Sequence, residues 1–92
     1  MSLLSLADHA IFDASDEGGI ILDTRAGLYF DLNVTATIML QAALACETID
    51  QVVARLVERI DGSADTLRTG VESLVTELRA RELLVPGATG LA

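Results

Sequence analysis

The stretch ILDTRAGLYFDLN, residues 21–33, decides the fold because it places a turn, a strand and a helix start in succession. Leu28–Leu32 alternates large apolar residues with a tyrosine and an aspartate, which predicts a β-strand that buries one face. Gly27 suits the left-handed position of a hairpin turn before this strand, and Asn33 is a good N-cap for a helix after it. The stretch therefore predicts the second arm of a hairpin that leads directly into a helix.

Two further strands are predicted before this stretch. His9–Ala14 alternates in the manner of a half-buried strand, and Ile20–Leu22 is short and rich in β-branched residues. The DEGG segment, residues 16–19, predicts the turn between them, because glycine tolerates positive φ. Three strands joined by two short turns form an antiparallel meander, in which the first and third strands are both edges. The open question is what pairs with the free side of Leu28–Leu32.

Three helices are predicted after the strands. Val34–Ala45 follows the Asn33 cap, Thr48 and Gln51 have the spacing of a capping box, and Ser63 can cap a last helix over Ala64–Arg81. The apolar stripe of the second helix consists of Ile49, Val52, Val53, Leu56, Val57 and Ile60. The stripe of the third consists of Leu67, Val71, Leu74, Val75 and Leu78, with Arg68, Glu72 and Arg79 just beyond its margin at Val75. The predicted fold class is α+β, a three-stranded meander followed by three helices.

The composition excludes several classes of function. Fourteen acidic residues against six arginines and no lysine give a formal net charge of −8, which argues against nucleic-acid binding. The single cysteine cannot form an intramolecular disulfide, and the chain has neither a secretion signal nor an apolar run of the ~20 residues that span a membrane. We therefore expect a cytoplasmic protein without a membrane partner.

The sequence offers no recognisable catalytic or metal-binding cluster. His9 and Cys46 stand alone, without the third group that would orient a catalytic pair. A phosphate-binding loop is also missing, since no glycine-rich segment ends in the required lysine. We expect no catalytic residues, no metal and no cofactor, so the protein is predicted not to be an enzyme.

The chain resembles the PqqD-like family, the peptide-recognition elements of pathways that make ribosomally synthesised, modified peptides. The resemblance is carried by a D-T-x-x-G-x-Y-F-x-L-N hairpin starting at Asp23, an I-D-x-V-V-x-x-L helix starting at Ile49, and a last helix ending in a leucine pair. It covers the chain from about Ala10 to Val85 and implies a winged-helix-like domain over residues 1–85. The small residues that follow, 86–92, predict a disordered tail.

The resemblance also implies a function, namely binding of the leader segment of a precursor peptide. The leader would add as a strand beside Leu28–Leu32, in a groove against the third helix, and the protein would deliver it to a leader peptidase, after which a separate cyclase acts. The implied peptide-binding residues are Leu28, Tyr29, Phe30, Asp31, Leu32, Arg68, Val71, Glu72, Val75, Leu78 and Arg79. The absence of tryptophan after the last helix favours the lasso-peptide branch of the family.

Two alternatives stay open at this point. A PqqD-like carrier that feeds a radical enzyme, as in pyrroloquinoline quinone biosynthesis, would use the same groove and differ only in its partner. A winged-helix DNA-binding regulator would need a basic face, which the lysine-free composition disfavours. The oligomeric state is also open, because two exposed strand edges can pair with one another.

Overall fold

The elements appear in the predicted order in the computed structural model, which describes residues 3–85. They are β1 (Ala10–Ser15), β2 (Gly18–Asp23), β3 (Leu28–Leu32), α1 (Val34–Ala45), α2 (Ile49–Val57) and α3 (Ala64–Ala80). The α+β fold class is therefore confirmed. The tail predicted for residues 86–92 lies outside the described residues. Among residues 3–85, no helix combines the length and the apolarity needed to cross a membrane.

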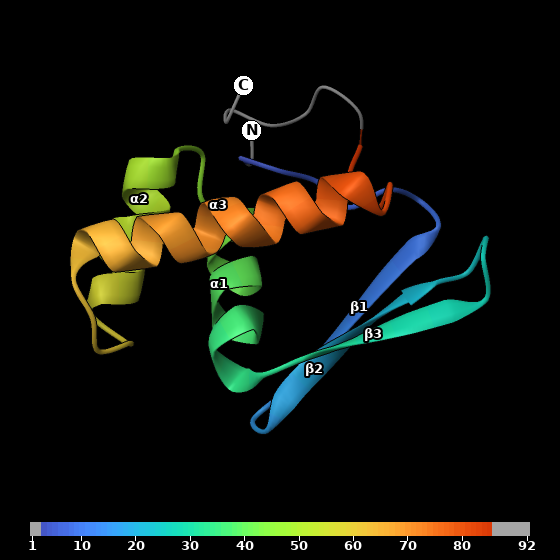
Figure 1. Ribbon diagram of the computed structural model, residues 1–92, viewed down its shortest axis with the longest axis horizontal. Helices are drawn as coiled ribbons and strands as arrows, with labels where there is room; N and C mark the ends of the chain where they lie inside the picture. The colour runs from blue at the N-terminus through green and yellow to red at the C-terminus, as the bar shows by residue number, and fades with distance from the viewer. Residues whose placement is uncertain (1–2, 86–92) are drawn as a thin grey trace.

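The three strands form one antiparallel sheet in the order β1-β2-β3 (Figure 1). Phe12 pairs with Ile21, which pairs with Phe30, so one residue of each strand lies in the same row on the inner face. Within the described part of the chain, β3 pairs with β2 on one side and with no strand on the other. The edge that the sequence predicted is therefore free in the structure.

The first turn is shorter than predicted, because Gly18 and Gly19 belong to β2 and not to the turn. The backbone of Gly18 has a φ of 137°, and a Cβ there would lie 2.5 Å from the carbonyl oxygen of Leu32. A Cβ on Gly19 would lie 3.0 Å from Thr37 Oγ1. Glycine is thus needed here so that β2 can pack closely against the end of β3 and the start of α1. The sequence pattern had instead explained these two glycines by the flexibility of a turn.

Side-chain caps fix where each helix begins. Asn33 Oδ1 accepts a hydrogen bond from the Ala36 amide at 2.7 Å, and Ser63 Oγ accepts one from the Thr66 amide at 3.2 Å. Thr48 Oγ1 accepts from the Gln51 amide at 3.2 Å, while the Gln51 side chain accepts from the amide one residue before the cap. These bonds satisfy amides that have no partner inside the helix. The predicted helix starts are confirmed.

The core lies among the three helices and the inner face of the sheet. Leu40 and Leu56 are fully buried, and so are Val52 and Val71. The helix α1 packs on β2 and β3. The helix α3 packs across α1 and α2 and extends beyond them above the sheet (Figure 1). The second helix was predicted to be longer than it is. In the structure α2 ends at Val57, which is 48% exposed, so the predicted apolar stripe of this helix does not continue in helical form to Ile60.

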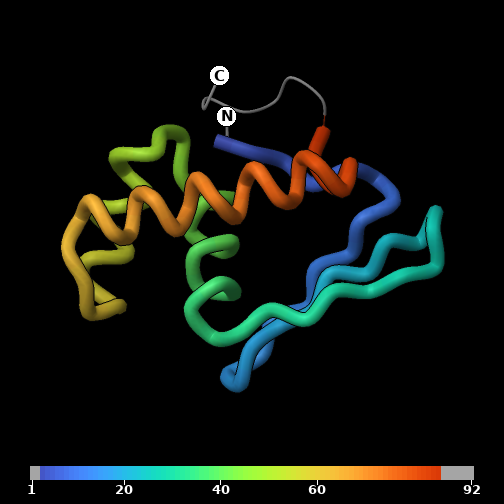
Figure 2. The backbone as a smooth tube through the Cα atoms, in the orientation of Figure 1, coloured from blue at the N-terminus to red at the C-terminus, as the bar shows by residue number. Residues whose placement is uncertain are grey.

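The two ends of the described chain pair with each other in a feature that the sequence did not reveal. Leu6 bridges to Leu84, the Ala7 amide donates to the Leu83 carbonyl at 2.9 Å, and the Val85 amide donates to the Ser5 carbonyl at 2.9 Å. We call this pairing of residues 5–7 with residues 83–85 the terminal strap (Figure 2). The strap fixes the end of α3 and does not pair with the free edge of β3.

Candidate functional site

A groove with a cavity of about 310 Å³ lies between β3 and α3. Its apolar lining consists of Ile21, Phe30, Leu32, Leu74 and Leu78, and its polar lining of Tyr29, Asp31, Glu77 and Arg81. We call this the β3–α3 groove. It runs beside the free edge of β3, so unpaired main-chain groups and an apolar surface lie next to each other.

The alternation in β3 explains which of its residues enter the groove. Phe30 and Leu32 pack against the core and are half-buried, whereas Tyr29, just before Phe30, is 66% exposed, and Asp31, between the two, is exposed as well. Successive side chains of a strand point to opposite faces, so Phe30 and Leu32 lie on the helix side. Leu28 was expected on that side too, but its side chain is 55% exposed and lies outside the groove lining. The apolar surface of β3 therefore centres on Phe30.

The helix α3 contributes one flank of its apolar stripe. Glu77 and Leu78 follow Leu74 by three and four residues, and Arg81 follows them by four and three, so all four lie on one face of the helix. Leu74 is half-buried, while Leu78 is 3% exposed and joins the groove to the core. This flank faces β3 across the groove.

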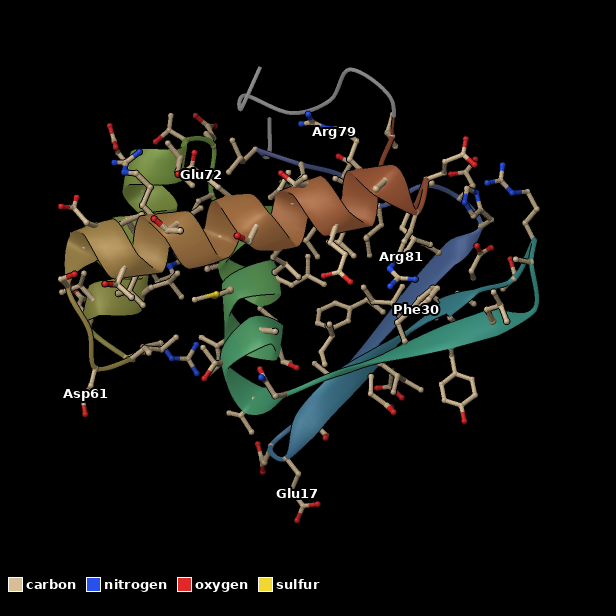
Figure 3. All side chains as sticks on the ribbon, in the orientation of Figure 1. Glu17, Phe30, Asp61, Glu72, Arg79 and Arg81 are labelled. Carbon is tan, nitrogen blue, oxygen red and sulfur yellow. The ribbon has the colours of Figure 1, made fainter. Side chains whose placement is uncertain are left out.

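Arg81 closes part of the groove mouth. Its guanidinium carbon lies 4.2 Å from the centre of the Phe30 ring, and its Nη2 donates to Glu77 Oε1 at 3.1 Å. Figure 3 shows Arg81 extending from the end of α3 toward Phe30 on β3. A cation over an aromatic face is attracted by the negative charge of the ring face. Arg81 thus bridges the two walls of the groove by side-chain contact alone.

The structure brings together only part of the residue set expected from the sequence. The groove contains Tyr29, Phe30, Asp31, Leu32 and Leu78. It does not contain Leu28, Arg68, Val71, Glu72, Val75 or Arg79. On α3 the expectation followed the flank at Val75, whereas the flank that faces β3 is the one at Leu74.

Three of the residues outside the groove have other surroundings. Val71 and Val75 are 0% and 2% exposed, which places them in the core between helices and not at a margin. Arg68 pairs with Asp50 on α2, and this hydrogen bond is the main cause of a pKa raised above the ordinary arginine value. These contacts direct the three side chains toward the helices and away from the sheet.

Glu72 and Arg79 lie on other faces of α3. Glu72 lines a shallow surface depression on the outer side of the helix, together with Thr69 and Ser73. Arg79 points to the side of α3 opposite to Arg81 (Figure 3). There it lines a hollow of about 790 Å³ with His9, which bonds to the Glu82 carbonyl at 2.8 Å. This hollow is larger than the groove, but no residue of β1, β2 or β3 lines it.

Leu74, Glu77 and Arg81 are groove residues that the sequence interpretation missed. The signal was present, since the three positions follow the same 3–4 spacing as Leu78. The pattern shows that α3 has an apolar stripe, but it does not show which flank of that stripe faces the sheet. That choice depends on how α3 crosses α1, which is a tertiary feature.

The described residues show no arrangement suited to metal binding. Across residues 3–85, no three His, Cys, Asp or Glu side chains are grouped closely enough to hold an ion. Cys46 is a buried free thiol at the end of α1.

Two solved structures are similar to this chain over nearly its whole length. One is described as lasso peptide synthetase B1 complexed with the leader peptide, with a TM-score of 0.80, 25% identity, and coverage of 92% of this chain and 100% of the other. The second is described as TbiB1 in complex with the TbiA(beta) leader peptide, with a TM-score of 0.77, 16% identity, and coverage of 94% and 96%. The second likeness supports the fold alone.

A comparison with curated protein sequences gave no significant match. The model of one protein family, described as coenzyme PQQ synthesis protein D (PqqD), matches residues 18–84. The match includes β2, β3 and all three helices, and hence both walls of the β3–α3 groove. The resemblance inferred from the hairpin and helix motifs is thereby confirmed, and the chain belongs to the PqqD family.

Proposed function

We propose that this protein binds the leader segment of a precursor peptide as an added strand on β3, and delivers it to the leader peptidase of a lasso-peptide pathway. The observation that carries the proposal is the free edge of β3 beside an apolar groove. A peptide strand on this edge can form main-chain hydrogen bonds with β3, while alternate side chains enter the groove. Affinity and selectivity then come from different parts of the same site.

The spacing of a sheet fits this arrangement. An added strand lies about 4.8 Å from its neighbour, and every second side chain points to the same face as Phe30 and Leu32. Those guest side chains meet Leu74 and Leu78 on α3, which offer an apolar surface without main-chain donors. Large apolar or aromatic leader residues suit such a surface, because their burial releases the most ordered water.

The comparisons support the choice of a leader peptide as the guest. The similar structure with 25% identity is described as lasso peptide synthetase B1 complexed with the leader peptide. We extend this binding role to the present chain and place it in the cytoplasm, where its free thiol Cys46 stays reduced.

The proposed role in the pathway is that of an adaptor without catalysis of its own. A precursor held by its leader has a raised effective concentration at a peptidase that binds the adaptor, without any new contact to the core of the precursor. The expected partners are the leader peptide, the leader peptidase and, at a later step, the cyclase. The prediction is that peptidase cleavage of the precursor is faster in the presence of this protein.

Strand addition can be tested by N-methylation of the leader peptide. The probe is the labelled leader of the precursor encoded beside this chain's gene, with one backbone amide methylated at a time, and binding is followed by fluorescence anisotropy. In a β-ladder only alternate residues of a strand bond to a given neighbour, so methylation should weaken binding at every second position. Equal tolerance at all positions would contradict strand addition, and the absence of saturable binding by the unmodified leader would contradict the whole proposal.

A second candidate follows from the family itself. The matching family model is described as a coenzyme PQQ synthesis protein. The alternative function is therefore that of a peptide carrier whose partner is a radical enzyme. The two candidates share the groove and differ in the neighbouring genes. A precursor, a protease and an asparagine-synthetase-like cyclase next to this gene identify a lasso pathway, whereas a radical enzyme identifies the alternative.

A further inference from the structure

The charges along the β3–α3 groove are not uniform. Arg81 lies over Phe30, and Arg25 lies in the turn just before β3, where it pairs with Glu82 at 3.5 Å. At the other end of β3, Asp31 and Glu17 line a surface pocket without any arginine. The protein has a formal net charge of −8, so acidic side chains outnumber basic ones on average. A guanidinium at the groove therefore departs from the average charge of the protein.

Arg81 is held so that its charge faces the groove. Its ion pair with Glu77 at 3.1 Å and its stacking on Phe30 fix the guanidinium plane, while 43% of the side chain stays exposed. A guanidinium has five N–H donors, and the single bond to Glu77 uses one of them. The remaining N–H groups can therefore donate to a second carboxylate at the groove mouth.

We propose that Arg81 is a specificity-determining residue, which selects guest strands that carry an aspartate or glutamate beside the apolar residue in contact with Phe30. This inference rests on the proposed function and adds to it the chemistry of the preferred peptide. Glu77 acts as a positioning residue, because it holds the guanidinium over the ring. The acidic side chain binds to the free donors of Arg81, with the fork geometry that a carboxylate and a guanidinium share.

The test is a selection from a display library of random 12-residue peptides, which needs no knowledge of the natural leader. The library is selected on the wild-type protein and on Arg81→Glu, and peptides that still bind Phe30→Ala are discarded. Wild-type peptides are expected to share an aspartate or glutamate at a fixed distance from a large apolar residue. Selection on Arg81→Glu is expected to replace that acid with lysine or arginine. Arg81→Glu should weaken the wild-type peptides about tenfold, the size of one close charge pair at an interface.

Matched variants separate a local effect from a general one. Arg55→Glu makes the same change of charge on the exposed side of α2, away from the groove, and should leave the selected peptides unchanged in affinity. Arg81→Met keeps apolar cover over Phe30 and should lose the preference for acid without loss of folding, as checked by thermal unfolding. Equal weakening by Arg55→Glu and Arg81→Glu would overturn the inference.

The remaining outcomes distinguish this inference from the proposed function. Phe30-dependent peptides without a shared acid would leave peptide binding in place and overturn the role of Arg81. If no peptide depends on Phe30, the groove is not the binding site, and both the inference and the proposed function fail. A shared acid that reverses sign with Arg81→Glu supports both.

Discussion

The helix α3 has two sides that differ in what they meet. On one side Val71 and Val75 are sealed against α1 and α2, and Gly70 lets Met39 approach so closely that a Cβ would lie 2.8 Å from its terminal methyl carbon. On the other side Leu74 is only half-buried and Arg81 is exposed beside the free edge of β3. The same apolar stripe is thus satisfied inside the chain on one side and left open on the other. The closed side supplies stability, and the open side is available for binding.

The largest loss of stability is expected from a substitution in the core where α2 packs against the closed side of α3. Leu56 on α2 is fully buried, so Leu56→Ala should lower the free energy of unfolding by about 2–5 kcal/mol, from lost burial and a residual cavity. Chemical denaturation measures this loss. The control is Val57→Ala, one residue further and 48% exposed, which should change stability by less than about 0.5 kcal/mol. Similar losses for both variants would contradict the packing described for α2.

A smaller loss of stability, with a larger effect on binding, is expected on the open side. Phe30 is half-buried, so Phe30→Ala should cost about 1–2 kcal/mol of folding stability, below the ~3–5 kcal/mol of a fully buried phenylalanine. The same change should raise the dissociation constant for the leader peptide at least about tenfold, because it removes the centre of the groove. Titration of the folded variant with labelled leader measures this. If Leu56→Ala weakens binding by the folded protein as much as Phe30→Ala does, the two sides are not separable.

The smallest effect concerns the joint between the two sides, at the end of α3. Glu82 has a φ of 59°, a left-handed conformation that costs a non-glycine residue about 1 kcal/mol. Glu82→Gly removes this cost and loses only an exposed ion pair with Arg25, so stability should rise by about 0.5 kcal/mol or more. Glu82→Ala keeps the conformational cost and loses the same pair. Thermal unfolding should therefore rank glycine above alanine, and the reverse order would contradict the backbone argument.

Much of the fold followed from local patterns in the sequence. The alternation at Leu28–Leu32 and the caps at Asn33, Thr48 and Ser63 predicted a strand and three helix starts at the positions that the structure shows. These features depend on a few neighbouring residues, so the sequence contains the information directly. The free edge of β3 could be predicted in the same way, because a meander of three strands always leaves its third strand an edge.

The features that the sequence did not reveal depend on contacts between distant segments. Gly18 and Gly19 were assigned to a turn, since their need for close approach to Leu32 and Thr37 is visible only after the sheet meets α1. The groove flank at Leu74 and Arg81 depends on the crossing of α3 over α1 in the same way. Leu3 and Leu4 are buried in the same core cluster as Leu83 and Leu84, beside the terminal strap, which pairs segments at opposite ends of the described chain.

The terminal strap has a consequence for the order of events during synthesis on the ribosome. The sheet is translated first, whereas α3, which forms the second wall of the groove, is translated after the other helices, and its end is fixed by the pairing of residues 83–85 with residues 5–7. A nascent chain that ends before α3 therefore has a finished meander with α1 packed on it, but it lacks the second wall of the groove. Capture of a guest strand becomes available only after α3 and residues 83–85 have been translated, so a chain that stops before them offers the free edge of β3 without the groove beside it.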